Sequence, residues 1–407
     1  MTRSSVDRPL GVALLGSTGS IGSQAVEVLA LHPDRFRAVA LAAATNTTEL
    51  EAQARRLRPA AVAIGDERLT LDLPSGTERL VGEDALEALA TRPDVDLVVV
   101  GTGGIVSLRP VLAALEAGKV VATANKETLV AGGHLVMPLA RALAATRGAD
   151  PAADPLASPL AWLRPIDSEH SAIWQCLAGE RATGIARLIL TASGGPFLEA
   201  SEAALEAVTP ADALRHPTWR MGAKITVDSA TLANKGLEVI EAHWLYDVAY
   251  EAIEVVVHPQ SVVHSAVAFV DGSLKAQLGT PDMRLPIQYA MTYPDRLASP
   301  TAAPDLVDIG RLEFRAPDER RFPALRIARD AGRLGPRASA ALIAADEVAV
   351  SRFLDGSLSF TGIPRLLEAA VERFRDGGVA PDLGSLLELD REVRAVCATA
   401  ARDGRLS

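Results

Sequence analysis

The fold of this 407-residue chain is decided by the stretch Val12-Ala13-Leu14-Leu15-Gly16-Ser17-Thr18-Gly19-Ser20-Ile21-Gly22. Its apolar start predicts a buried strand, its glycines predict a tight turn, and the apolar residues that follow have helical spacing. Glycines at such a turn let the backbone approach a pyrophosphate, and the start of a helix favours an anion. We therefore predict a dinucleotide-binding unit. The spacing is not G-x-G-x-x-G, so a plain β-to-α turn is the alternative.

Further strands are predicted at 38–42, 61–64, 97–100 and 120–122, and they alternate with helical patterns near 48–58, 83–91 and 108–117. This alternation predicts an α/β fold with an N-terminal Rossmann-like, doubly wound parallel sheet. Ligands bind at the carboxyl ends of the strands in such sheets.

Ala124-Asn125-Lys126-Glu127 follows the last of these strands, at the ligand-binding edge. We expect Asn125 and Glu127 to face a cofactor and Lys126 to reach a substrate. A solvated helix start is the alternative for Lys126 and Glu127.

Ala44-Thr45-Asn46 follows the second strand, where an NAD-binding unit usually has an acid for the ribose hydroxyls. A carboxylate there repels a 2′-phosphate, so its absence favours NADP, with Thr45 and Asn46 as hydrogen-bond donors. No arginine replaces the acid, which limits the strength of this indication.

A second motif, Pro165-Ile166-Asp167-Ser168-Glu169-His170, carries two carboxylates two residues apart. In an extended chain Asp167 and Glu169 point to one face and converge. Converging carboxylates form a hard oxygen site suited to Mg²⁺ or Mn²⁺. A solvated acidic turn is the alternative.

The segment 224–241 supplies a third acid. We predict a strand at its start that leads through Asp228-Ser229 into a helix with Asn234, Glu238 and Glu241 on one face. Glu238 is the expected third metal ligand, since two acids leave a divalent ion under-coordinated. The neighbouring Lys235 suits an anionic substrate. An exposed helix face is the alternative for Glu238 and Glu241.

Two loops complete the candidate site. Ser193-Gly194-Gly195 follows a predicted strand and can offer a hydroxyl and backbone N–H groups to a phosphate. A turn without a ligand is the alternative. The loop from His216 to Gly222 carries large side chains that suit a lid or core packing. His258 and His264 are interpreted as structural, because no third nitrogen or thiolate ligand lies at suitable spacing.

The composition of the chain argues against several classes of function. The net charge of -10 argues against a nucleic-acid partner held by a basic field. Two distant cysteines, Cys176 and Cys397, do not suggest disulfides or a metal site. No apolar run reaches the ~18 residues of a membrane helix, and the N-terminus does not resemble a signal peptide. We expect a cytoplasmic protein without a membrane partner.

From residue 279 to residue 323 the chain is rich in proline, and it then shows helical patterns near 324–333, 337–355, 363–376 and 384–402. These predict a connector and a C-terminal four-helix domain.

In combination, these motifs closely resemble the 1-deoxy-D-xylulose 5-phosphate reductoisomerase family. The resemblance rests on residues 16–22, 124–127, 167–171, 193–197, 216–219 and 224–244, in order along nearly the whole chain. It implies a homodimer that uses NADPH and Mg²⁺ or Mn²⁺ to rearrange and reduce a phosphorylated sugar, 1-deoxy-D-xylulose 5-phosphate, to 2-C-methyl-D-erythritol 4-phosphate. Hypothetically, the metal acts as a Lewis acid while the carbon skeleton rearranges by retro-aldol cleavage and re-addition, before NADPH reduces the aldehyde.

The resemblance also implies site residues and domains. The expected metal ligands, which are also catalytic, are Asp167, Glu169 and Glu238. Lys126 and His216 are the other expected catalytic residues. The expected substrate contacts are Lys126, Ser168, Glu169, Ser193, His216, Trp219, Ser229, Asn234, Lys235 and Glu238. The expected cofactor contacts are Thr18, Gly19, Ser20, Ile21, Ala44, Thr45, Asn46, Asn125, Glu127 and Gly222. The expected divisions are an NADPH-binding domain at 1–146, a linker at 147–161, a central α+β catalytic domain at 162–290, a connector at 291–322 and a helical domain at 323–407.

The chain departs from the family pattern in three places. Ala44-Thr45-Asn46 replaces Gly-Lys-Asn or Gly-Arg-Asn, which removes a cation near the 2′-phosphate. Residues 147–161 are longer than the usual connector. Ala344-Ala345-Asp346-Glu347 replaces Ala-Ala-Asn-Glu, away from the expected chemistry.

Two alternative functions remain from the sequence. One is a metal-free NAD(P)-dependent dehydrogenase of the semialdehyde or homoserine type, which would stay active in EDTA. The other is a nucleotide-binding sensor with a degenerate site, which turnover would exclude.

Overall fold

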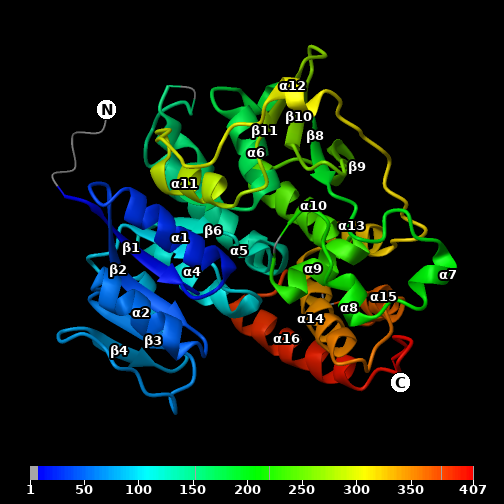
Figure 1. Cartoon of the computed structure of the whole chain (residues 1–407), viewed down its shortest axis with the longest axis horizontal. Coiled ribbons are helices and arrows are strands. Elements are labelled where there is room, and N and C mark those ends of the chain that lie inside the picture. Colours follow the sequence, from blue (N-terminus) through cyan, green and yellow to red (C-terminus); the bar gives the residue numbers. More distant parts are fainter. Residues whose placement is uncertain (1–7, 152, 220, 377, 407) are drawn as a thin grey trace.

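The computed structural model describes residues 8–151, 153–219, 221–376 and 378–406. The chain forms an N-terminal parallel sheet with helices packed on it, a smaller central sheet and a C-terminal group of helices (Figure 1). This confirms the predicted fold class. The ends of the predicted domains, at residues 1–7 and 407, and residue 152 of the predicted linker lie outside the described residues.

The N-terminal sheet has seven parallel strands in the order β4-β3-β2-β1-β5-β6-β7. The strands are β1 (Leu10–Leu15), β2 (Phe36–Ala43), β3 (Ala61–Ile64), β4 (Glu78–Val81), β5 (Leu97–Val100), β6 (Val120–Thr123) and β7 (Leu163–Pro165). The helices between them are α1 (Ser20–Leu31), α2 (Thr47–Leu57), α3 (Ala85–Ala90), α4 (Leu108–Glu116) and α5 (Lys126–Ala145). Most strand residues are buried because helices cover a parallel sheet.

The strand order reverses between β1 and β5, and the crevice at such a point is where open α/β sheets bind ligands. The turn after β1 lies directly against the chain that leaves β5. A Cβ on Gly16 would lie 2.8 Å from the carbonyl carbon of Gly101, and Gly16 has a φ of +85°. Only glycine fits this position without strain.

The central sheet has four strands in the order β11-β10-β8-β9. Its strands are β8 (Ile185–Ala192), β9 (Ile253–Val257), β10 (Val263–Phe269) and β11 (Leu274–Leu278). β9 runs parallel to β8, whereas β10 is antiparallel to both β8 and β11. The helices of this part are α6 (Ser168–Leu177), α7 (Glu202–Leu205), α8 (Pro210–Ala213), α9 (Ala223–Thr231) and α10 (Ala233–Tyr246). α6 packs on β10 and β11.

The four predicted C-terminal helices are confirmed as α13 (Ala324–Leu334), α14 (Pro336–Leu354), α15 (Gly362–Phe374) and α16 (Leu383–Ala398). α13 packs on α10, and α14 packs on α5 (Figure 1). Gly236 of α10 lies against α13, where an added Cβ would come within 2.5 Å of the Ala328 Cβ. This close helix contact explains the glycine inside α10.

The predicted strand at the start of segment 224–241 is wrong, because these residues form the first turns of α9. Ile225, Thr226 and Val227 are β-branched and favour strands locally, but such preferences depend strongly on tertiary context. The break that we expected at Asp228-Ser229 lies instead at Leu232, which adopts a left-handed φ of 61° between α9 and α10. Asp228 and Ser229 are therefore inside a helix.

Other segments also differ from the predictions. β7, which lies within the predicted second domain, is the edge strand of the first sheet. The strands β4 and β11 were not predicted. The proline-rich region contains α11 (Arg284–Thr292), which packs on α1 and α6, and α12 (Leu306–Ile309).

The helix α5 is long and apolar enough to cross a membrane by length and composition, contrary to our reading of the sequence. More than half of this stretch is buried inside the protein, where it contacts α4, α10 and α14. Its apolar character is that of a central core helix.

Candidate active site

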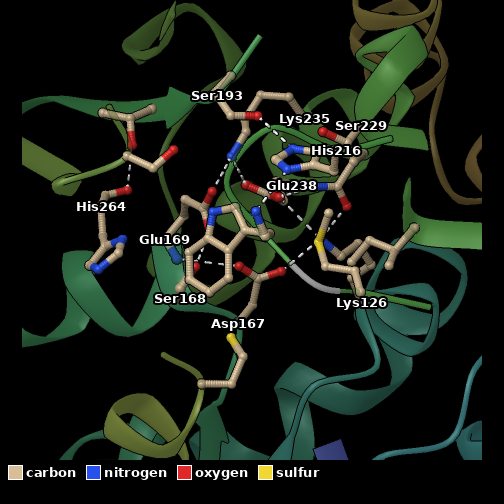
Figure 2. A pocket seen from close by; sticks show the side chains of 18 of the residues that line it. Lys126, Asp167, Ser168, Glu169, Ser193, His216, Ser229, Lys235, Glu238 and His264 are labelled. Carbon is tan, nitrogen blue, oxygen red and sulfur yellow. Dashed lines mark hydrogen bonds and ion pairs between the residues drawn. The ribbon is translucent and has the colours of Figure 1, made fainter. Parts of the chain in front are cut away.

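Three carboxylates converge between the two sheets, and they are the three predicted as metal ligands. One oxygen from each of Asp167, Glu169 and Glu238 lies within 4.8 Å of the other two. Asp167 and Glu238 are buried, whereas Glu169 is partly buried. Figure 2 shows the three side chains pointing toward one another. This donor set and spacing fit a hard divalent cation.

The way in which Asp167 and Glu169 meet differs from the prediction of an extended chain. β7 leads directly into Asp167, which is the N-cap of α6, and Glu169 lies in the first turn of that helix. The Asp167 side chain accepts a hydrogen bond of 3.3 Å from the Glu169 N–H. The start of a helix therefore brings the two acids together, and its dipole favours their negative charge.

Two buried lysines partly neutralise the three acids. Lys126 Nζ lies 2.6 Å from Asp167 Oδ2 and 3.1 Å from Glu238 Oε1. Lys235 Nζ lies 2.7 Å from Glu169 Oε1 and 2.5 Å from Glu238 Oε2. With all five groups ionised, the cluster carries one net negative charge, which a cation can compensate.

The pKa values follow from burial and these pairings. Burial alone raises the pKa of Asp167, but the charges of Lys126, His170 and Lys235 together outweigh it and hold this pKa well below its usual range. Burial and then the carboxylate of Glu238 raise the pKa of Glu169. Burial lowers the pKa of Lys126, but Asp167 and Glu238 raise it well above its usual value. Lys126 and Asp167 are consequently both charged at neutral pH.

The residues predicted to contact the substrate lie in one pocket beside the acids (Figure 2). This pocket is lined by Lys126, Ser168, Glu169, Ser193, His216, Trp219, Ser229, Asn234, Lys235 and Glu238, among others. Ser193 follows β8, Ser229 lies on α9, and Asn234 and Lys235 lie on α10. Hydroxyl, amide and ammonium donors from three elements thus face one space, as an anion requires.

The loop after β8 lies very close to α9. Gly195 has a φ of +68°, and an added Cβ would lie 2.8 Å from the Ser229 carbonyl oxygen. This approach, possible only for glycine, brings Ser193 and Ser229 to the same side of the pocket.

His216 is held in one orientation by its own loop. Its Nδ1 accepts hydrogen bonds from the N–H groups of Thr218, at 3.2 Å, and Trp219, at 2.9 Å. The ring proton therefore lies on Nε2, which donates to Ser193 Oγ at 3.0 Å. Burial lowers the pKa of His216, which keeps the ring neutral at pH 7.

The predicted cofactor contacts are spread more widely. Ser20, Ile21 and Gly222 line the pocket, and Thr18 and Gly19 lie in the adjoining turn after β1. Ala44, Thr45 and Asn46 are exposed after β2, and the Asn46 side chain caps α2. They sit at the same edge of the sheet as the turn.

Asn125 and Glu127 are not placed in the pocket lining. The Asn125 side-chain nitrogen donates to the carbonyl oxygens of Thr102 and Gly104 and to Ser107 Oγ, each at 2.8 Å. Its oxygen accepts from the Thr128 N–H. Asn125 thus ties the loops after β5 and β6 together, and its side chain has no spare donor.

Sequence reasoning missed several residues that line the pocket. His264, which we interpreted as structural, faces the pocket and its ring lies 6.0 Å from that of Trp219, centroid to centroid. Ile225 and Met283, which were also missed, add apolar surface, as does Met221 of the predicted lid loop. No spacing signal marks the missed residues, because they reach the pocket from α9, β10 and the start of α11.

Three family models match most of the chain. The model of 1-deoxy-D-xylulose 5-phosphate reductoisomerase matches residues 12–133, and models of C-terminal domains of the same enzyme match 163–246 and 278–396. The reductoisomerase of Thermomicrobium roseum is 49% identical over 95% of this chain and 96% of its own length. The chain belongs to the 1-deoxy-D-xylulose 5-phosphate reductoisomerase family.

Other reductoisomerases agree in sequence and in structure. The Pelotomaculum thermopropionicum protein is 48% identical over 96% of this chain and 98% of its own length. The Zymomonas mobilis reductoisomerase in complex with NADPH has a TM-score of 0.84 and 36% identity, covering 98% of each chain. A reductoisomerase in complex with NADPH, fosmidomycin and magnesium has a TM-score of 0.85 and 37% identity, covering 95% of this chain and 97% of that one.

The family assignment confirms the predicted activity. This reductoisomerase converts 1-deoxy-D-xylulose 5-phosphate to 2-C-methyl-D-erythritol 4-phosphate in the non-mevalonate pathway, with NADPH and a divalent metal as cofactors. The acidic trio described above fits the metal requirement.

Proposed function

We propose that the reaction takes place in the pocket between the two sheets, with Asp167, Glu169 and Glu238 as the metal ligands. The observation that carries this proposal is the convergence of three acids, with one oxygen of each within 4.8 Å of the others. When bound, the metal ion polarises the substrate oxygens and NADPH supplies the reducing equivalent.

The residues of the chain itself bind and orient the substrate. Ser193, Ser229, Asn234 and Lys235 hold its phosphate, because their donors line one side of the pocket. This grip keeps the fragments of the rearranging sugar in place, so that their recombination is effectively intramolecular. Ser168 lies along the substrate between the metal ligands.

Lys126 holds a proton beside two of the acids and lies at the start of α5, next to the crevice. Its ammonium stabilises negative charge that develops on substrate oxygens. His216 and Trp219 come from one loop, and Trp219 closes over the pocket and excludes water. The neutral His216 ring orients Ser193 toward the phosphate.

NADPH lies across the edge of the first sheet, with its pyrophosphate against Thr18, Gly19, Ser20 and Ile21. The crevice between β1 and β5 supports this position. Ala44, Thr45 and Asn46 face its 2′-phosphate, and Gly222 and the segment of Asn125 and Glu127 adjoin its nicotinamide end.

A cytoplasmic homodimer is part of the same proposal, as are the domain limits 1–146, 162–290 and 323–407. Exposed apolar residues support the dimer: Leu274 on the edge strand β11 is 59% exposed, and Val307 on α12 is 88% exposed. A monomer in sedimentation experiments at micromolar concentration would contradict it.

The assay is NADPH absorbance with 1-deoxy-D-xylulose 5-phosphate, with and without Mg²⁺, for the wild type and Glu238→Gln. We expect oxidation only in the wild type with Mg²⁺. Glu254→Gln on β9, where the carboxylate is exposed, serves as the matched control and should keep full activity. Activity in EDTA, or in Glu238→Gln, would contradict the assignment of the metal ligands.

A further inference from the structure

A second buried charge cluster joins the C-terminal helices to the helix that carries Ser229. Lys224 Nζ of α9 lies 2.7 Å from Asp228 Oδ2, one turn along the same helix, and 2.6 Å from Asp346 Oδ2 of α14. Asp228 and Asp346 are 3% and 1% exposed. One ammonium therefore bridges two carboxylates across the contact between α9 and α14.

The cluster has more negative than positive charge. The second oxygens of the two acids, Asp228 Oδ1 and Asp346 Oδ1, are buried and have no hydrogen-bond partner within the described residues. Glu127 of α5 lies 3.6 Å from Lys224 Nζ and adds a third carboxylate. Glu347, which follows Asp346 on α14, interacts electrostatically with Arg394, Lys224 and Glu127.

Arg394 does not supply the missing positive charge. Its guanidinium lies 2.6 Å from Glu347 Oε2 and 2.6 Å from Asp390 Oδ2, so it is already shared between two acids. Two buried carboxylates beside one ammonium cannot both ionise without a large cost, so such pairs commonly keep one proton. A proton kept on one of the unpaired oxygens also turns that oxygen into a hydrogen-bond donor.

The titration of Asp228 falls near neutral pH. Burial, and then the carboxylate of Asp346, raise the pKa of Asp228 to about 7. The folded state therefore binds a proton that the unfolded state has lost between about pH 4 and about pH 7. Asp228 is protonated below neutrality and loses this proton as the pH rises further.

The position of the pair connects it with substrate binding. Asp228 precedes Ser229, which lines the pocket, and α9 begins directly after the lid loop, at Gly222. α14 packs on α9 and on α5, which begins with Lys126. A change in the α9–α14 contact thus reaches the phosphate side of the pocket through one helix.

We propose that Asp228 holds one proton beside Lys224 and the carboxylate of Asp346, that this arrangement keeps α9 against α14, and that loss of this proton weakens substrate binding at Ser229. The link to the substrate rests on the proposed phosphate contact of Ser229. The two aspartates are positioning residues, since neither lines the pocket.

The test is the Michaelis constant for 1-deoxy-D-xylulose 5-phosphate between pH 6 and pH 8.5, in wild type and Asp346→Asn. We expect this constant to rise roughly fivefold through pH 7 in the wild type, a modest coupling between sites, with little change in kcat. Asp346→Asn keeps an acceptor for Lys224 but removes the second carboxylate, and it should lack this rise. Asp355→Asn, at the exposed end of α14, should behave like the wild type.

The phosphate of the substrate also titrates near neutrality, but it does so identically for every variant. The difference between the pH profiles of the variants therefore reports only the effect of the two aspartates. An identical pH profile in wild type and Asp346→Asn would overturn the proposal. Should Asp346→Asn not fold, Asp228→Asn is the second variant, because it also leaves one carboxylate beside Lys224.

A second readout does not depend on activity. The raised pKa of Asp228 makes the wild type lose thermal stability between about pH 4 and about pH 7, and Asp346→Asn should lose less over this range. Equal slopes of melting temperature against pH in the two proteins would contradict the proton on Asp228. A difference in slope without any turnover would contradict the proposed function but would still support the proton on Asp228.

Discussion

Lys126 Nζ lies 2.6 Å from Asp167 Oδ2, and this contact joins the first residue of α5 to the N-cap of α6. The two helices follow β6 and β7, which are neighbours in the first sheet. Adjacent parallel strands therefore place a cation and a metal-binding acid side by side at the carboxyl edge of the sheet.

Replacement of Lys126 should separate catalysis from metal binding. Lys126→Met keeps the three carboxylates but removes the ammonium beside the substrate, so we expect kcat to fall by about 100-fold, the typical effect of losing one stabilising donor. Mn²⁺ binding at pH 8, followed by calorimetry, should persist. The matched control is Lys275→Met on β11, where the lysine is exposed. A loss smaller than tenfold, or the loss of Mn²⁺ binding, would contradict this role.

His216 and Ser193 should act as one unit. Because the Nε2–H group donates to Ser193 Oγ, His216→Ala and Ser193→Ala should each raise the Michaelis constant for the sugar phosphate about tenfold. The double variant should be less impaired than the product of the two effects, as for any pair in contact. Steady-state kinetics of the four proteins measure this, and fully multiplicative effects would argue against the contact. Ser351→Ala, exposed on α14, controls for the loss of a hydroxyl.

A cation introduced after β2 should improve the use of NADPH. Thr45 is exposed at the position where the family usually has lysine or arginine, and Thr45→Arg should lower the Michaelis constant for NADPH by about fivefold at low salt. The constant for NADH should stay the same, since NADH lacks the 2′-phosphate. Ser351→Arg adds the same charge on α14 and should change neither constant. An equal effect on both nucleotides would place the 2′-phosphate elsewhere.

The two thiols should be unreactive in the folded enzyme. Cys176 and Cys397 are buried, and burial raises the pKa of each to about 11. At pH 8 roughly one thiol in a thousand is ionised, and the thiolate is the reactive form. A thiol reagent such as dithionitrobenzoate should therefore modify neither cysteine until denaturant is added, and then both. Rapid modification of the native protein would refute the burial of these side chains.

Local patterns predicted the parts of the fold that local sequence controls. The strand, turn and helix over Val12–Leu31 follow from apolar periodicity and glycine, so the position of the dinucleotide crevice was predictable. The four C-terminal helices were predicted for the same reason. Segment 224–227 was predicted wrongly because its β-branched residues favour a strand locally, whereas packing makes it a helix.

The site was predictable where one short motif carries the chemistry. Asp167 and Glu169 were found from their spacing, although a helix N-terminus, not an extended chain, brings them together. His264 was missed because only the tertiary fold brings β10 to the pocket. Asp346, noted only as a departure from the family pattern, is paired with Lys224 of α9, a contact across 122 residues that no local pattern shows.

The most direct test of the account is the position of Mn²⁺ in crystals of this enzyme, located by its anomalous scattering. We predict a single strong peak within coordination distance of carboxylate oxygens of Asp167, Glu169 and Glu238, and no peak there in Glu238→Gln. A manganese ion bound elsewhere, with these three acids uncoordinated, would contradict the account.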